Sequence, residues 1–213
     1  MEKDTAEQLL TRARGCIRIF NDMIEFAQCH CDKGEERVVR HAVGYTLSEL
    51  LDRLMVPIFT DDPDLVPEGL DYGPLDGPKF SELAAKMKQE PPPSEPRRGH
   101  EPQGCERGTP SMDKDTAKQL MARAFDCMRL VNEMTEVALS NGDEDELRVV
   151  RRAAGHTIAE MYERLIDPVL REYPDLLPEG IDYTPLKGPT FTELAAQLRP
   201  ASPPSETGSR KKP

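Results

Sequence analysis

Apolar side chains recur in the first part of the chain at alternating steps of four and three residues, which is the spacing of one face of an α-helix. The stripe consists of Leu9, Ala13, Cys16, Phe20, Met23 and Ala27. A capping-box sequence at Thr5–Gln8 predicts that this helix begins at Thr5. A second apolar stripe predicts a helix from about Glu35 to Phe59, which Pro57 should kink or end. Phe80–Met87 is predicted to be a short third helix.

This pattern occurs twice. Residues 112–199 align with residues 1–88 without a gap, and 45 of the 88 aligned positions are identical. Self-similarity at this level indicates an internal duplication. We therefore distinguish repeat 1 (1–88) and repeat 2 (112–199). The linker 89–111 and the tail 200–213 are rich in proline and poor in apolar residues, so both are expected to be disordered.

The duplication predicts how the apolar stripes are buried. A helical hairpin of this size cannot cover its own stripe, whereas two hairpins can cover each other. We therefore predict an all-α fold in which the repeats pack as a pseudo-twofold four-helix bundle. Gly44 and Gly155 interrupt the second helix at equivalent positions. Because a glycine inside a helix costs about 1 kcal/mol relative to alanine, we expect a neighbouring helix to pack closely there.

The charge of the chain limits its partners. It holds 39 acidic and 28 basic side chains, a formal net charge of −11. Such a surface repels phosphate backbones and anionic lipids, so neither nucleic acid nor a membrane is expected as a partner. The acidic start, Met1–Glu7, does not have the pattern of a signal peptide. The odd number of cysteines, 5, indicates a reducing compartment, and a cytoplasmic location is expected.

Motifs for catalysis are missing from the sequence. There is no glycine-rich phosphate loop, no Gly-x-Ser-x-Gly and no Glu-x-x-His. We therefore expect neither enzymatic activity nor a cofactor.

Four arginines near the start of the second helices are candidates for anion binding. They are Arg37 and Arg40 in repeat 1 and Arg148 and Arg151 in repeat 2. Guanidinium groups bind carboxylate and phosphate well. The alternative is that these arginines form ion pairs with nearby acids such as Asp32, Glu36 and Glu25.

The end of the first helix carries possible metal ligands in Cys29, Cys31 and His41. Thiolate and imidazole bind zinc and copper. The matching positions of repeat 2 are Ser140, Gly142 and Arg152, which cannot replace them. We therefore predict no metal site and keep this cluster as a weak candidate.

A Pro-Glu-Gly segment follows the second helix in both repeats. Its matched residues are Leu65, Pro67, Glu68 and Tyr72 in repeat 1 and Leu176, Pro178, Glu179 and Tyr183 in repeat 2. The segment is expected either to cover the core as a lid or to dock a partner.

Together these patterns favour a non-enzymatic interaction or assembly module with an unidentified protein partner. The two repeats are expected to associate within the chain, and a homo-oligomer is a further expectation. The alternative is a sensor that holds a small molecule or a metal between the helices. An assembly module should have a packed interior and an apolar outer patch. A ligand-binding protein should instead have a polar-lined cavity near Gly44 and Gly155.

Overall fold

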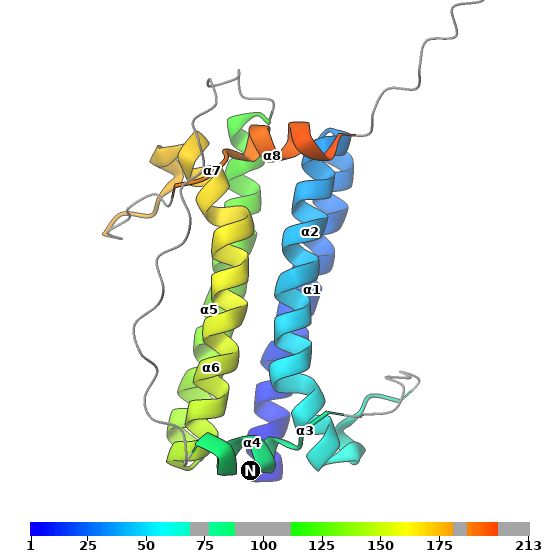
Figure 1. Ribbon diagram of the computed structural model, residues 1–213, viewed down its shortest axis with the longest axis vertical. Helices are drawn as coiled ribbons and strands as arrows, with labels where there is room; N and C mark the ends of the chain where they lie inside the picture. Colours follow the sequence, from blue (N-terminus) through cyan, green and yellow to red (C-terminus); the bar gives the residue numbers. More distant parts are fainter. Residues whose placement is uncertain (69–76, 88–111, 181–186, 200–213) are drawn as a thin grey trace, which may run out of the picture.

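The computed structural model describes residues 1–68, 77–87, 112–180 and 187–199 (Figure 1). In these ranges every regular element is helical, which confirms the all-α prediction for them. Repeat 1 contains α1 (Lys3–His30), α2 (Lys33–Leu50), α3 (Val56–Asp61) and α4 (Phe80–Met87), and repeat 2 contains α5 (Lys114–Asn141), α6 (Glu144–Met161), α7 (Asp167–Glu172) and α8 (Phe191–Leu198). The linker, the tail, Tyr72 and Tyr183 lie outside the described residues.

The predicted start of the first helix at Thr5 is wrong. α1 begins at Lys3, and Thr5 is a buried residue inside its first turn. In repeat 2 the carboxylate of Asp113 caps α5, because it accepts hydrogen bonds from the backbone N–H groups of Asp115 (3.0 Å) and Thr116 (2.9 Å). An aspartate in front of the helix satisfies these donors, so the threonine is left to pack.

The second helix of repeat 1 begins at Lys33, two residues before the predicted start at about Glu35. Asp32 and Asp143 are the N-caps of α2 and α6, and each forms a capping box with the glutamate three residues later. The start of each second helix is therefore fixed by local hydrogen bonds.

The regular α-helix is interrupted just before Pro57 and Pro168, while the helical path continues past both prolines. A π-helical turn, Leu51–Met55, joins α2 to α3, and Tyr162–Ile166 joins α6 to α7. Each proline then lies in the first turn of the helix that follows, where no backbone N–H is needed. The helical path continues to Asp61, two residues beyond the predicted end at Phe59.

The four long helices lie side by side as a helical bundle (Figure 1). α1 packs against α5, α2 packs against α6, and each repeat also packs its own two long helices together. The seam predicted for α1 is buried, with Leu9, Ala13, Cys16 and Met23 all 0% exposed. The Cys16 sulfur lies 3.8 Å from the backbone oxygen of Cys127, so the two helices are in direct contact there.

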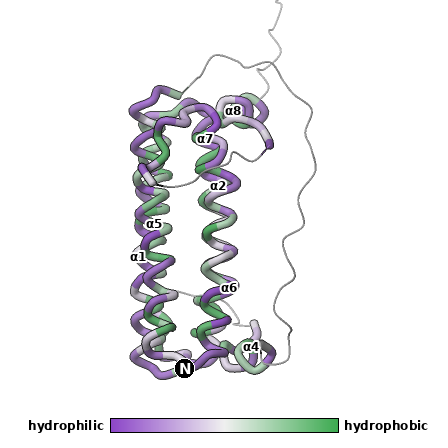
Figure 2. Tube along the Cα trace, turned by 90° about the vertical axis from the view of Figure 1, so that its left-hand side faces the viewer, coloured by the Kyte–Doolittle hydropathy of each residue, from purple (hydrophilic) through white to green (hydrophobic). Residues whose placement is uncertain are grey.

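The short helices cross from one repeat to the other. α8 packs on α2 and α4 packs on α6, at opposite ends of the bundle (Figures 1 and 2). A Cβ atom on Gly34 of α2 would lie 2.3 Å from the backbone oxygen of Ala195 of α8, so only glycine allows this approach. Arg37 Nη1 also donates to the Leu198 carbonyl at 2.7 Å. Each repeat therefore closes one end of the other.

No helix in the described ranges has both the length and the apolar character that crossing a membrane requires.

The expected close packing at Gly44 and Gly155 is wrong. Both residues are exposed, and a Cβ atom on either would have no other described heavy atom within 4 Å. The two glycines therefore lie on the outside of the bundle.

This geometry predicts that alanine stabilises the fold at these positions. Gly44→Ala and Gly155→Ala should each raise the free energy of unfolding by about 1 kcal/mol, because alanine has the higher helix propensity and meets no clash. Urea unfolding followed by circular dichroism measures this change. Gly34→Ala is the matched control in α2, and it should destabilise the protein. Loss of stability in Gly44→Ala would contradict the geometry.

Candidate docking surface on the outer side of α2 and α6

One stripe of exposed residues runs along the outer side of α2, and an equivalent stripe runs along α6. We call them together the α2–α6 face. It consists of Arg37, Arg40, His41, Gly44, Tyr45 and Ser48 on α2, and of Arg148, Arg151, Arg152, Gly155, His156 and Ala159 on α6. These are all the exposed residues in the ranges 37–48 and 148–159.

The α2–α6 face differs in charge from the rest of the chain. Neither range contains an aspartate or glutamate, and together they carry five arginines, although the chain as a whole has a net charge of −11. Acids border both ranges: Arg40 pairs with Glu36, and Arg148 pairs with Glu144, whose side chain is 79% exposed, so the excess of positive charge is confined to the ranges themselves.

Two contacts join α2 to α6 in the middle of the face. The guanidinium carbon of Arg164 lies 3.7 Å from the centre of the Tyr45 ring, a cation–π arrangement. His156 Nδ1 lies 4.0 Å from a carboxylate oxygen of Glu49. The two glycines flank these contacts, so the middle of the face combines small residues with an exposed aromatic ring.

The four arginines predicted to bind an anion do not converge on one site. α2 and α6 run in opposite directions, so Arg37 and Arg40 lie near α8 while the arginines of α6 lie near α4 (Figure 1). Arg40 pairs with Glu36 at 2.8 Å and Arg148 with Glu144 at 2.7 Å. The alternative of pairing with nearby acids therefore accounts for one arginine in each repeat.

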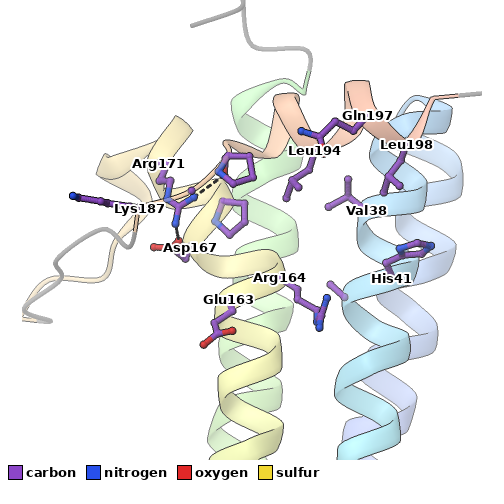
Figure 3. Close-up of a pocket in the computed structure, with 14 residues that line it drawn as sticks. Val38, His41, Glu163, Arg164, Asp167, Arg171, Lys187, Leu194, Gln197 and Leu198 are labelled. Atoms are coloured by element: carbon purple, nitrogen blue, oxygen red, sulfur yellow. Dashed lines mark hydrogen bonds and ion pairs between the residues drawn. The ribbon is translucent and has the colours of Figure 1, made fainter. Parts of the chain in front are cut away.

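A cavity of about 410 Å³ opens at the α8 end of the face (Figure 3). Val38 and Ala42 of α2 form part of its wall, and Leu194 and Leu198 of α8 form another part. His41 and Arg164, which belong to or border the face, stand beside it. The cavity and the face are therefore one continuous surface.

A buried ion pair lines the same cavity. Asp167 is 1% exposed and pairs with Arg171, whose Nη1 also donates to the Pro189 carbonyl at 2.8 Å. The sequence analysis did not predict this ion pair, although the two repeats differ at both of its positions. The equivalent residues of repeat 1 are Val56 and Thr60, and the Thr60 hydroxyl donates to the Val56 carbonyl within the helix.

Replacing Asp167 and Arg171 by the equivalent residues of repeat 1 tests how much this ion pair contributes to stability. Arg171→Thr should lower the free energy of unfolding by about 3 kcal/mol, because it leaves a buried carboxylate without its cation. Asp167→Val combined with Arg171→Thr installs the residues of repeat 1 and should recover most of that loss. Urea unfolding of the single and double variants decides between these outcomes. A double variant less stable than Arg171→Thr would show that the pair acts through more than charge compensation.

The Cys/His cluster is spread over several environments. Cys29 and His41 are exposed, and the His30 ring stacks on Phe26 with 4.5 Å between ring centres. Within the described residues, no three His, Cys, Asp or Glu side chains are grouped so that they could hold a metal ion. His41 lines the cavity instead.

Cys31 lies beside the start of α2. Its burial, and to a smaller extent the nearby carboxylates of Glu35 and Asp32, raise the pKa of its thiol to about 12. The thiolate is the reactive form, so Cys31 should react with a disulfide reagent about a thousand times more slowly at pH 8 than a thiol with an ordinary pKa. In the variant Cys29→Ser/Cys105→Ser, the native rate should still rise tenfold per pH unit between about pH 9 and 11.

The urea-unfolded variant is the control for this measurement. Unfolding removes both the burial and the fixed carboxylates, so the rate should level off near about pH 9. Equal pH profiles for the native and unfolded protein would contradict the environment assigned to Cys31.

The Pro-Glu-Gly segments are described only in their first parts. Pro63–Leu65 and Pro174–Leu176 are 3₁₀-helical turns. Leu65 is buried against the core, and Arg14 donates to its carbonyl at 3.2 Å, whereas Leu176 is only partly buried. This packing supports the lid interpretation for repeat 1. The remaining predicted residues, Pro67 and Glu68 and their equivalents Pro178 and Glu179, contribute little to the core.

The expected apolar outer patch is not found in the described part of the chain. The exposed large apolar side chains there are Tyr45 and Leu139, which stand on different helices.

Comparisons with protein-family models, with curated proteins and with solved structures found no match to this chain. Its function must therefore be inferred from the geometry of the site.

Proposed function

We propose that this chain is a non-enzymatic interaction module that binds a helical segment of another protein along the α2–α6 face. The exposed glycines carry this proposal. Gly44 and Gly155 each cost about 1 kcal/mol of helix stability, and no side chain or other helix among the described residues comes within 4 Å of a Cβ atom placed on them. A partner backbone that packs against them would use the space that a side chain would otherwise fill.

The surroundings of the glycines suit a helical partner. Ser48 follows Gly44 by one turn and Ala159 follows Gly155 by one turn, so both helices present small residues at adjacent turns. Helices pack with their axes 8–10 Å apart, and small residues at the contact allow the lower end of that range. A helix is the partner element that can lie along such a row of small residues.

The proposal includes a pseudo-twofold relation between the repeats. Two ion pairs at equivalent positions support it: Arg12 of α1 lies 3.7 Å from Glu133 of α5, and Arg123 of α5 lies 2.6 Å from Asp22 of α1. Under this arrangement Arg37, Arg40 and Gly44 of α2 correspond to identical residues of α6, whereas the other three exposed positions of the face differ in residue type: His41/Arg152, Tyr45/His156 and Ser48/Ala159. We propose that a dimer of single repeats is the simplest precursor of such a chain.

The cavity of about 410 Å³ favours a second candidate, a small-molecule binding protein. Its volume is within the range of ligand sites, roughly 300–1,000 Å³. Two of the ionic pairs at its wall are formed within the chain, Asp167 with Arg171 and Arg164 with Glu160, while Glu163 and Lys187 also line it. The apolar part of the wall, formed by Val38, Ala42, Leu194 and Leu198, suits an apolar side chain of a partner.

Photo-crosslinking tests the docking proposal. A benzophenone amino acid is placed at Ser48 or Ala159 on the face, or at Gln28 or Ala122 on α1 and α5 as exposed controls. In cells that express the protein naturally, the face positions should crosslink to one discrete protein and the control positions should not. Gly44→Leu should abolish that crosslink, since a large side chain holds the partner away, while the helix content stays unchanged.

Two outcomes would contradict the proposal. One is crosslinking of the same strength from all four positions. The other is no protein adduct at the face together with a small-molecule signal that Val38→Phe, which fills the cavity, removes; that result would establish the second candidate.

A further inference from the structure

The Cys16 and Cys127 side chains meet inside the bundle, where α1 packs on α5. The Cys16 sulfur lies 3.8 Å from the backbone oxygen of Cys127. The two thiols also contact each other: a hydrogen bond with the Cys16 side chain, followed by burial, raises the pKa of the Cys127 thiol. Both cysteines are free in this structure. Two free thiols in contact, one from each repeat, are the starting arrangement for a disulfide.

The register of α1 against α5 explains why these two cysteines meet. Two ion pairs join residues whose numbers sum to 145, namely Arg12 with Glu133 and Asp22 with Arg123. Equivalent residues of the two repeats differ in number by 111. Equivalent residues can therefore face each other only near positions 17 and 128. Cys16 and Cys127 are equivalent residues one position from that point.

The helices are close together at this level. Cysteine has a short side chain, and the Cys16 sulfur nevertheless reaches the backbone of the opposite helix. Next to it, a Cβ atom on Gly15 would lie 2.9 Å from a side-chain methyl carbon of Leu130. A disulfide joins Cα atoms about 4.4–6.8 Å apart, a separation that only closely packed helices provide.

Burial decides when the pair can react. Cys16 is 0% exposed and Cys127 is 1% exposed. A buried thiol packs as a small apolar side chain, and it reacts only as a thiolate that a reagent can reach. The pair therefore stays reduced while α1 and α5 are packed together, and it reacts when they open locally. The exposed thiol of Cys29 reacts without such an opening.

We propose that Cys16 and Cys127 are a disulfide site that joins the two repeats covalently when the chain meets a small disulfide oxidant. This inference goes beyond the docking proposal and does not depend on it. Once the link has formed, α1 and α5 cannot separate. The walls of the cavity, which come from α2 of repeat 1 and from α8 of repeat 2, then stay together as well.

The reaction is a thiol–disulfide exchange in two steps. The thiolate of one cysteine attacks an oxidant R–S–S–R, a protein–S–S–R bond forms and R–S⁻ leaves. The thiolate of the second cysteine then attacks the protein sulfur of this mixed disulfide, and the second R–S⁻ leaves. The two protein sulfurs are oxidised, the two sulfurs of the oxidant are reduced, and the two thiol protons end on R–SH.

Peptide mapping of the full chain tests the proposal. The folded protein is incubated with hydroxyethyl disulfide, the remaining thiols are blocked, and the chain is cut with trypsin. Peptides 15–18 and 124–129 should be found linked, and a reductant should separate them. The other cysteines lie in peptides 19–33 and 99–107, so every other pairing has a different mass. In urea-unfolded protein the fixed contact is lost, and links should be spread over several pairs.

The link should also stabilise the pairing of the repeats. It closes a loop of about 111 residues, so the oxidised protein should unfold at a urea concentration about 1–2 M higher than the reduced protein. Cys16→Ala should remove both the linked peptides and this shift. Cys29→Ala is the matched control, and it should keep both.

Two results would overturn the inference. One is that Cys16 and Cys127 stay reduced after Cys29 has reacted completely, or that they are linked no more often in the folded protein than in urea. The other is a linked protein that unfolds at the same urea concentration as the reduced protein or at a lower one, because the link would then distort the contact between α1 and α5 instead of securing it.

Discussion

Burial of the apolar stripe of α1 is the constraint on which the rest of the structure depends. A stripe of this length must be covered, and the other helices of the same repeat cover only part of it. α5 provides the missing surface, and the contact is close enough for the Cys16 sulfur to reach the Cys127 backbone. The second helices then have to lie beside each other, and their outer sides become the α2–α6 face. The candidate docking surface is therefore a consequence of how the two repeats bury their cores.

The predictions that succeeded depend on local sequence. The apolar spacing of α1 and the bounds of the third helix at 80–87 follow from residues within a few turns. The π-helical turns and the crossing of α4 and α8 could not be read in this way. The π-helical turns precede a proline in each repeat, and the two crossings depend on packing partners more than fifty residues away in the chain.

Gly44 and Gly155 show most clearly what could not be predicted from the sequence. Their position inside a helix predicted a close neighbour, but sequence cannot tell whether that neighbour belongs to the same chain. In the structure both glycines face outward, away from the interior where the close contact was expected. The Asp167–Arg171 pair was missed for a related reason. It breaks the match between the repeats, and similarity draws attention to what is shared.

The most direct test of this account asks whether the two repeats form one folding unit. A protease site that replaces Gly104–Glu106 in the linker allows the folded full-length protein to be cut between the repeats. The account predicts that the two halves stay together in size-exclusion chromatography, keep their helical circular dichroism, and separate only as urea unfolds both in one transition. Halves that separate after the cut and remain folded, helical monomers would contradict it.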